Sequence, residues 1–253
     1  MKIWAIADLH LSFGVPNKKM DVFGTQWINH GDTIAKNWSQ IVGQEDLVLI
    51  PGDISWALTI DEARPDLEWI EKLPGTKIMI KGNHDLWWNS LSKVKKILPP
   101  SCHVIQNNSW TKNGVSIAGT RLWDIPGLSF KEYIAIQDVA ALAKEGERIE
   151  EEETRKIYQR ELGRLETSLK ELDPNATTKI AMTHYPPIGP DFKETEVSLL
   201  FEKYGVNISV FGHLHNIKPN VELFGTHHGI HYSLVACDYL HRFSPLLVSE
   251  GVL

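Results

Sequence analysis

The stretch Lys77-Ile78-Met79-Ile80-Lys81-Gly82-Asn83-His84-Asp85 joins a short apolar run to a cluster of polar side chains. An apolar run of this kind, rich in β-branched residues, predicts a strand that is buried in a largely parallel sheet. The same pattern occurs at four other places in the chain. These runs cover residues 2–7, 47–50, 179–183 and 207–211, and polar side chains follow each of them directly.

The five polar clusters contain enough potential metal ligands for two ions. In parallel sheets, sites form in the crevice beyond the carboxyl ends of the strands, so these clusters are expected to meet at one edge. A single Asp-x-His is common and indicates little, whereas five such clusters in one chain are hard to attribute to chance. The clusters are Asp8-Leu9-His10, Gly52-Asp53, Gly82-Asn83-His84-Asp85, His184 and Gly212-His213-Leu214-His215.

The residue types indicate the chemistry. Carboxylates, imidazoles and one amide carbonyl form a mixed nitrogen and oxygen shell without thiolate, which suits Mn, Fe or Zn. A carboxylate can bridge two cations about 3.5–4 Å apart, and such a pair can hold a hydroxide and clamp a phosphoryl group during in-line displacement. Seven side chains suffice for two ions if one Asp bridges: Asp8, His10, Asp53, Asn83, His184, His213 and His215.

His84 is then left outside the metal shell, next to Asp85 in the chain. A histidine beside a carboxylate and near a dinuclear centre is well placed to donate a proton or to stabilise a developing charge. We therefore predict a catalytic rather than a metal-binding role for His84.

The ordered set of clusters resembles the calcineurin-like metallophosphoesterase family over nearly the whole chain, with no motif missing. The resemblance implies an α/β fold, a four-layer α/β/β/α sandwich of two mixed sheets flanked by helices, and hydrolysis of phosphate esters. Matched residue by residue, it places Asp8, His10, Asp53 and His215 on one metal. It places Asp53, Asn83, His184 and His213 on the other metal, with Asp53 bridging. His84 would be the leaving-group acid or an electrostatic stabiliser, and Asp85 its orienting partner.

Composition is that of a globular enzyme. Charged residues make up 23% and hydrophobic residues 42% of the 253 residues, and the length is compatible with one large α/β domain, which we predict over residues 1–253. The net charge of −6 argues against a general nucleic-acid binder. Cys102 and Cys237 are expected to be isolated thiols. No stretch suits a membrane span or a signal peptide, so a cytoplasmic location is the default expectation.

The remaining pattern predicts helices and hairpins around the sheets. Helical spacing covers residues 25–43, 58–73 and 91–98. Asn113-Gly114 predicts a hairpin between residues 104–107 and 115–118, and a second hairpin is predicted between residues 220–224 and 230–236. Residues 133–172 are densely charged and predict one or two amphipathic helices. A solvated covering layer is favoured there over a lid or a dimer surface.

Several residues near the clusters have two interpretations. Arg121 follows a predicted hairpin strand and is in position to grip a substrate phosphate, but a surface ion pair explains it equally well. Tryptophans 56, 87 and 88 either pack in the core or form a wall that faces the substrate. His227, His228 and His231 are better explained by a turn and a strand than by a further metal site.

The predicted function is hydrolysis of small phosphate mono- or diesters by in-line attack of a metal-bridging hydroxide. Arg121, Trp56, Trp87, Trp88 and Tyr185, a cation and aromatic rings, favour a compact ester, which could carry a nucleotide-like base, over a long polyanion. The alternatives are a protein phosphatase or a nuclease on the same fold, and a non-catalytic interaction module. The full ligand set and His84 argue against the module, whereas motifs alone do not separate a protein phosphatase.

Overall fold

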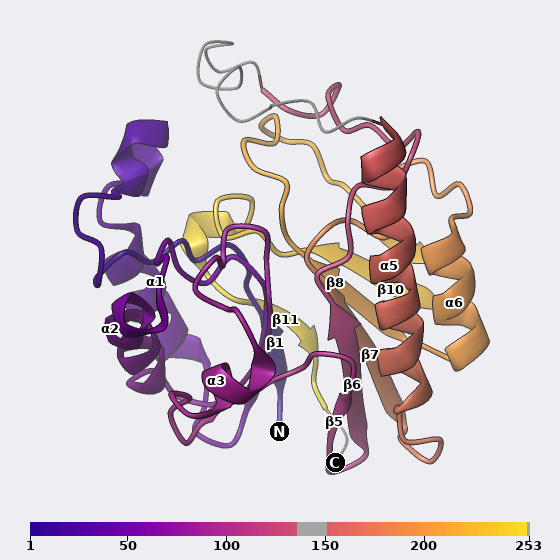
Figure 1. Ribbon diagram of the computed structural model, residues 1–253, viewed down its shortest axis with the longest axis horizontal. Coiled ribbons are helices and arrows are strands. Elements are labelled where there is room, and N and C mark those ends of the chain that lie inside the picture. Colours follow the sequence, from indigo (N-terminus) through magenta and orange to yellow (C-terminus); the bar gives the residue numbers. More distant parts are fainter. Residues whose placement is uncertain (136–150, 252–253) are drawn as a thin grey trace.

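A computed structural model describes residues 1–135 and 151–251. Two β-sheets pack face to face, and helices cover the outer face of each (Figure 1). The family resemblance implied this four-layer arrangement, and the structure confirms it. The first sheet has the order β11-β1-β2-β3-β4, with strands Leu246–Ser249, Ile3–Ala5, Leu47–Pro51, Thr76–Ile80 and Cys102–Val104. The second sheet has the order β5-β6-β7-β8-β10-β9, with strands Ser109–Lys112, Val115–Thr120, Thr178–Thr183, Ile208–Phe211, Ile230–Leu234 and Gly225–His227.

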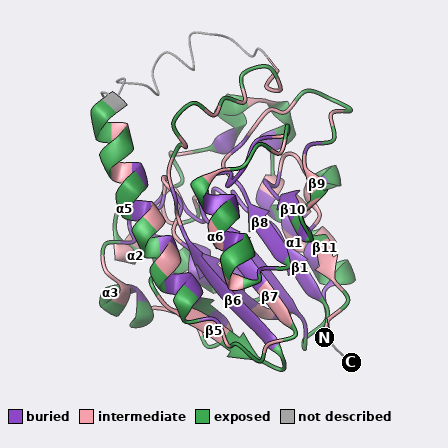
Figure 2. Cartoon of the chain, turned by 90° about the vertical axis from the view of Figure 1, so that its right-hand side faces the viewer, coloured by how far each residue is buried: buried purple, intermediate pink, exposed green. Residues whose placement is uncertain are grey.

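The inner strands of each sheet are parallel. Strands β1, β2, β3 and β4 run in one direction, as do β6, β7, β8 and β10, while β11, β5 and β9 pair antiparallel at the edges. The inner strands are almost entirely buried (Figure 2). This explains why their sequences are continuous apolar runs instead of an alternating pattern. All five runs that the sequence indicated are strands, within one or two residues of the predicted ends.

Helices from the N-terminal half of the chain form one outer layer, and helices from the C-terminal half form the other. The first sheet is covered by α1 (His30–Ile41), α2 (Ile60–Glu71) and α3 (Leu91–Lys95), and the second by α5 (Glu151–Lys170) and α6 (Glu196–Tyr204) (Figure 1). A capping box starts α2: the Thr59 hydroxyl accepts from the Glu62 N–H at 3.3 Å and the Glu62 carboxylate accepts from the Thr59 N–H at 3.1 Å. Short 3₁₀ turns occur at Met20–Phe23, Thr25–Trp27 and His241–Phe243.

Both predicted hairpins have a different first strand from the one expected. Residues 104–107 were predicted as the first strand of the Asn113-Gly114 hairpin. Instead, β4 ends at Val104 and pairs parallel with β3 in the first sheet, whereas β6 belongs to the second. The hairpin partner of β6 is β5, Ser109–Lys112, which alternates polar residues with one tryptophan and gives little apolar signal. In the second hairpin the strand β9 lies at Gly225–His227, inside the predicted loop, and the turn is His228-Gly229.

The charged segment contains the long helix α5, with its C-terminal end at Lys170. Tyr158, Leu165 and Leu169 are buried in the layer between α5 and the second sheet, which confirms an amphipathic helix. The predicted part at residues 136–150 lies outside the described residues. Cys102 and Cys237 are free thiols, as predicted. Among the described helices, none is long and apolar enough to cross a membrane.

Candidate metal centre

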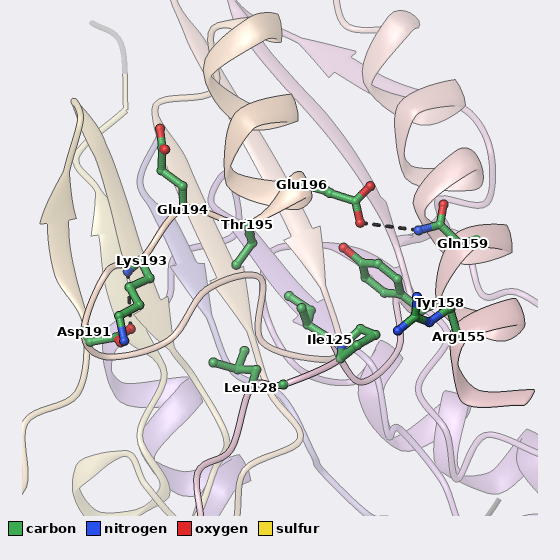
Figure 3. Close-up of a pocket in the computed structure, with 12 residues that line it drawn as sticks. Ile125, Leu128, Arg155, Tyr158, Gln159, Asp191, Lys193, Glu194, Thr195 and Glu196 are labelled. Atoms are coloured by element: carbon green, nitrogen blue, oxygen red, sulfur yellow. Dashed lines mark hydrogen bonds and ion pairs between the residues drawn. The ribbon is translucent and has the colours of Figure 1, made fainter. Parts of the chain in front are cut away.

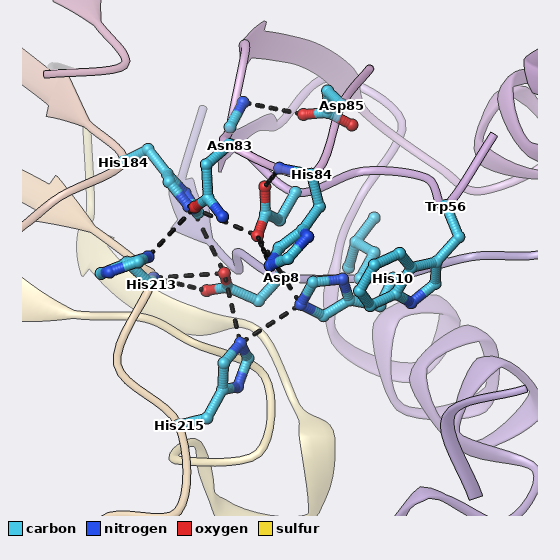
Figure 4. A network of polar contacts seen from close by, with 12 residues as sticks. Asp8, His10, Trp56, Asn83, His84, Asp85, His184, His213 and His215 are labelled. Atoms are coloured by element: carbon cyan, nitrogen blue, oxygen red, sulfur yellow. Dashed lines mark hydrogen bonds and ion pairs between the residues drawn. The ribbon is translucent and has the colours of Figure 1, made fainter. Parts of the chain in front are cut away.

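The carboxyl ends of five parallel strands bring the seven predicted ligands into one cluster (Figure 4). Asp8, His10, Asp53 and His184 are buried, and the other three are half-buried. The ligands come from both sheets, since Asp8, Asp53 and Asn83 follow strands of the first sheet and His184 and His213 follow strands of the second. The centre therefore lies where the two packed sheets meet.

One half of the cluster gathers around Asn83. The Asn83 Oδ1 lies 2.7 Å from Nε2 of His184 and 3.1 Å from Nδ1 of His213. The Nδ1 of His184 lies 3.0 Å from the carbonyl of Pro51, which assigns a ring proton to Nδ1 and turns Nε2 toward the cluster. The atoms that face one another are thus atoms that can ligate a cation.

The other half contains Asp8, His10 and His215, whose ligand atoms all lie within 4.8 Å of one another. Two imidazole Nε2 atoms, those of His10 and His215, are only 3.2 Å apart, and Asp8 Oδ1 is 3.7 Å from the second of them. The Nδ1 of His10 is buried and has no hydrogen-bond partner among the described residues. A divalent cation between these three side chains fits this donor set.

Asp53 reaches both halves of the cluster. Its Oδ2 lies 3.8 Å from Nε2 of His10 and 3.4 Å from Nε2 of His184. Asp8 also approaches His184, at 3.9 Å, but through the Nδ1 that is directed at Pro51. The ligating face of His184 is therefore turned to Asp53, and Asp53 is the better candidate for a bridging carboxylate.

The cluster places carboxylates and imidazoles together away from water. Burial raises the pKa of the Asp8 carboxyl to about 7. Burial acts in the same direction on Asp53, but attraction by its histidine neighbours, led by His184, brings its pKa below the ordinary value. Burial also holds the pKa values of His10 and His213 well below the usual range, which keeps both rings in the neutral form that a metal binds.

The backbone turns sharply where it presents these side chains. Asp8, His10, Asp53 and His213 have positive φ angles of 59°, 44°, 52° and 71°. This left-handed conformation is uncommon for residues other than glycine, and such residues concentrate at functional sites. The turns let the side chains leave the strand ends and point into one volume.

The glycine before a ligand is a packing requirement at three of the clusters, and at the first of them a Cβ on Gly52 would lie 2.6 Å from Nδ1 of His184. A Cβ at Gly82 would overlap the carboxylate and backbone nitrogen of Asp53, and a Cβ at Gly212 would overlap the carboxylate of Asp8. The Gly-Asn and Gly-His pairs in the sequence thus let one ligand loop lie directly against the carboxylate of another.

Comparison with known proteins identifies this arrangement. The family model of the calcineurin-like phosphoesterases matches residues 1–216. The chain belongs to this family. The phosphopantetheinyl hydrolase of Mycobacterium tuberculosis is similar in structure, with a TM-score of 0.53 and 17% identity, over 98% of this chain and 96% of that chain. At this identity the likeness shows the fold alone.

Two relatives are closer in sequence. Gene 66 protein of Mycobacterium phage L5 is 38% identical over 86 residues, which are 32% of this chain and 39% of the phage protein. An uncharacterised protein of Methanocaldococcus jannaschii is 31% identical over 121 residues, which are 45% of this chain and 68% of that protein. The chain therefore matches less than half of the phage protein.

One residue that supports this cluster has no counterpart among the residues predicted from the sequence. Asp238 lies just beyond β10 and its Oδ1 is 2.8 Å from Nδ1 of His215, which directs the Nε2 of that ring at Asp8 and His10. Although burial favours the neutral carboxyl, the charge and hydrogen bond of His215 hold the pKa of Asp238 below its usual range. The apolar run at residues 230–236 before Asp238 is the same signal that marked the other clusters.

Asp238→Asn should lower metal affinity or turnover by about 10–100-fold, the usual effect of losing an outer-shell partner. Asn removes the charge that holds the His215 ring, while it can still accept from the N–H of Asn216, which lies 3.0 Å from Oδ2. Metal titration of the purified variant would measure the change. Asp191→Asn, at an exposed carboxylate, is the control and should leave the metal affinity unchanged. An unchanged affinity and turnover in Asp238→Asn would contradict the assignment.

His84 lies beside the ligands with its side chain 30% exposed, whereas the His10 and His184 side chains are at most 3% exposed. The Nε2 of His84 is 4.0 Å from Asp53 Oδ2, and its backbone N–H donates to Asp53 Oδ1 at 2.8 Å. This places the ring at the solvent-facing side of the Asp53 carboxylate. The proton-donor role itself stays a prediction.

Asp85 is buried at the base of the same loop (Figure 4). It accepts hydrogen bonds from the backbone N–H groups of Gly82, Ile54 and Ser55 at 2.8, 2.9 and 3.1 Å, and from Trp87 Nε1 at 3.0 Å. These contacts tie the Asn83 loop to the Asp53 loop and so fix the spacing between two ligands. A role as the orienting partner of His84 stays a prediction.

Aromatic rings pack against the histidines on two sides. Trp56 stacks on His10 with ring centroids 5.0 Å apart and lies 4.5 Å from His84, while Tyr185 covers His213 at 4.0 Å. Of the three tryptophans considered, Trp56 is half-buried next to the centre, and residues 87 and 88 are buried in the core. Trp56 is therefore the one of the three that packs against rings of the cluster.

Arg121 lies outside the ligand cluster. Its guanidinium stacks on Trp123 at 4.6 Å and its Nη2 is 3.5 Å from Glu161 Oε1. Its backbone carbonyl accepts from the N–H groups of His184 and Tyr185, both at 3.1 Å, so the residue is adjacent to the centre even though its side chain is engaged elsewhere. Substrate contact by Arg121 stays a prediction.

A hollow of about 490 Å³ lies between α5 and the loops that follow β6 and β7 (Figure 3). Its lining includes Leu128, Tyr158 and Lys193 but none of the seven predicted ligands. A catalytic site is recognised by its ligands and titratable groups, and not by its volume alone. We therefore assign the chemistry to the polar cluster and not to this hollow.

Proposed function

We propose that this chain is a dinuclear metal-dependent phosphoesterase that hydrolyses small phosphate mono- or diesters. The observation that carries the proposal is the position of Asp53, whose Oδ2 lies within 3.8 Å of a ligating nitrogen in each half of the cluster. When bound, a pair of divalent ions would activate water and neutralise charge on the phosphoryl group. The donor set of imidazoles, carboxylates and one amide suits Mn²⁺, Fe or Zn²⁺.

The residues of the chain then have separate tasks. Asp53 holds the two halves of the centre at a fixed spacing, and Asp8 and Asn83 complete one half each. His84 holds a proton at the solvent-facing side and donates it to the leaving-group oxygen. Trp56 stacks on the His10 ring and shields it from bulk water, which strengthens charge interactions in the site.

The competing functions differ in what surrounds the centre. A nuclease needs many Lys and Arg contacts along a polyanion, and the net charge of −6 does not favour one. A non-catalytic module needs neither a complete ligand set nor His84, and both are present. A protein phosphatase uses the same centre, so phosphopeptides belong among the substrates tested.

The protein loaded with Mn²⁺ should hydrolyse 4-nitrophenyl phosphate or bis(4-nitrophenyl) phosphate, and chelation should abolish the activity. Because a compact ester makes few ionic contacts, kcat/KM should change little between 50 and 200 mM salt, in contrast to the about 10³–10⁵-fold loss typical of proteins with many phosphate contacts. A panel with cyclic nucleotides, nucleotide polyphosphates, phosphopeptides and duplex DNA would measure this. Salt-sensitive DNA cleavage without turnover of small esters would overturn the proposal.

A further inference from the structure

A cavity of about 300 Å³ lies between α5 and the segments that follow β3, β4 and β6, and charged and amide side chains line it together with Trp88 and Ile105. Four cationic residues contribute to its wall: Lys81, Arg121, Arg160 and Arg164. The remaining polar lining includes Asn89, Gln106 and Asn107, and the acidic residue is Glu161. The cavity wall thus has a formal surplus of three positive charges, in a chain whose net charge is −6.

Glu161 holds the arginines in place without exhausting their donors. Its side chain is 2% exposed, and its Oε1 lies 2.7 Å from Arg164 Nη1, 3.5 Å from Arg121 Nη2 and 3.6 Å from Arg160 Nε. Each guanidinium has five N–H donors, so one shared carboxylate oxygen leaves most of them available. A buried carboxylate that gathers three guanidinium groups pre-organises them for an anion.

The cavity and the metal centre share the same loops. Lys81 is two residues before Asn83, so their Cα atoms are at most about 7 Å apart. The backbone carbonyl of Arg121 accepts from the N–H of His184 at 3.1 Å, and His184 belongs to the same half of the centre as Asn83. A molecule held at Asn83 and His184 therefore lies next to two loops that also line the cavity.

We propose that this cavity is a subsite for a second anionic group, a phosphate or a carboxylate, on the same substrate molecule. This rests on the proposed function, because the first phosphate would be held at the metal centre. The guanidinium groups of Arg121, Arg160 and Arg164 bind the second anion through charge-assisted hydrogen bonds, and Lys81 adds a further charge. The preferred substrate class is a small phosphate ester with a second anionic group several bonds from the reacting phosphate.

Binding of matched anions to the Mn²⁺-loaded protein tests the subsite. The probes are butyl phosphate and the α,ω-alkanediol bisphosphates with two to six carbons, measured by calorimetry at fixed salt. At least one bisphosphate should bind about tenfold or more tightly than butyl phosphate, as expected for a charged hydrogen-bonded contact. ω-Phosphooxy carboxylates of the same lengths distinguish a carboxylate from a phosphate in the cavity.

In the variant Arg160→Gln/Arg164→Gln, the affinity for the bisphosphate should fall to within about twofold of that for butyl phosphate. The affinity for butyl phosphate itself should stay unchanged. The control Lys156→Gln/Lys170→Gln removes two charges from exposed positions of the same helix, both outside the cavity, and should keep the preference. If the double variant unfolds because Glu161 loses partners, the single variant Arg160→Gln, at a side chain 56% exposed, should lower the preference in part.

Equal binding of bisphosphates and butyl phosphate in the wild type would overturn the inference. A preference that persists in folded Arg160→Gln/Arg164→Gln would also overturn it, since the metal centre would then take both phosphates. Hydrolysis of 4-nitrophenyl phosphate separates this result from the proposed function. Turnover without a bisphosphate preference refutes only the subsite, and a cavity-dependent preference without any turnover refutes only the phosphoesterase activity.

Discussion

Asp53→Asn should remove at least one metal ion and nearly all activity while the protein stays folded. Its Oδ2 lies close to His10 in one half of the centre and to His184 in the other, and its Oδ1 accepts from the N–H of His84. Asn has one carbonyl oxygen and no charge, so it cannot neutralise two cations. The loss should exceed the about 10–100-fold typical of an outer-shell partner such as Asp238.

Metal analysis and turnover of the purified variant would measure this, with thermal unfolding as the check on the fold. Asp66→Asn is a matched control at another buried carboxylate, which accepts from the Ser55 hydroxyl and, at 2.8 Å, from the N–H of Phe13. Burial raises the pKa of Asp66 to about 6, and the carboxylate holds no predicted ligand, so its variant should keep both metals. Full metal content and near-normal turnover in Asp53→Asn would refute the bridging assignment.

The ligand cluster could be predicted from the sequence because its members directly follow strands that are recognisable from short stretches of the chain. A buried parallel strand is a continuous apolar run, and the ligands at its carboxyl end are the residues that directly follow this run in the sequence. Asn83 and Asp53 are therefore recognisable without knowing how the sheets pack. Their approach depends on the glycine before a ligand, since a Cβ at Gly82 would overlap Asp53, and this glycine is also visible in the sequence.

Edge strands and outer-shell partners are less predictable, because they depend on contacts between distant parts of the chain. The strand Ser109–Lys112 has a half-polar pattern, and only pairing with β6 makes it a strand. Asp238 follows an apolar run like the other clusters but stands alone, and its importance is evident only from its contact with His215. The cationic cavity likewise combines Lys81, just after β3, and Arg121, just after β6, with residues of α5, and no local pattern links them.

Proton donation by His84 predicts a different phenotype from the loss of a ligand. His84→Gln should keep both metals, because all seven ligands remain, but should lower turnover by about 10²–10⁴-fold. The backbone N–H that donates to Asp53 Oδ1 is retained in the variant, so the position of the carboxylate is preserved. His103→Gln, at an exposed histidine on β4, is the control for the loss of an imidazole and should leave turnover unchanged.

The dependence on the leaving group decides between the two roles predicted for His84. 4-Nitrophenol leaves as a stable anion and needs little protonation, whereas phenol and butanol need a proton as the bond to phosphorus breaks. Turnover by His84→Gln should therefore fall least for 4-nitrophenyl phosphate and most for butyl phosphate. An equal loss for all three esters would contradict the acid role and favour stabilisation of the phosphoryl group, since that charge is the same whichever alcohol departs.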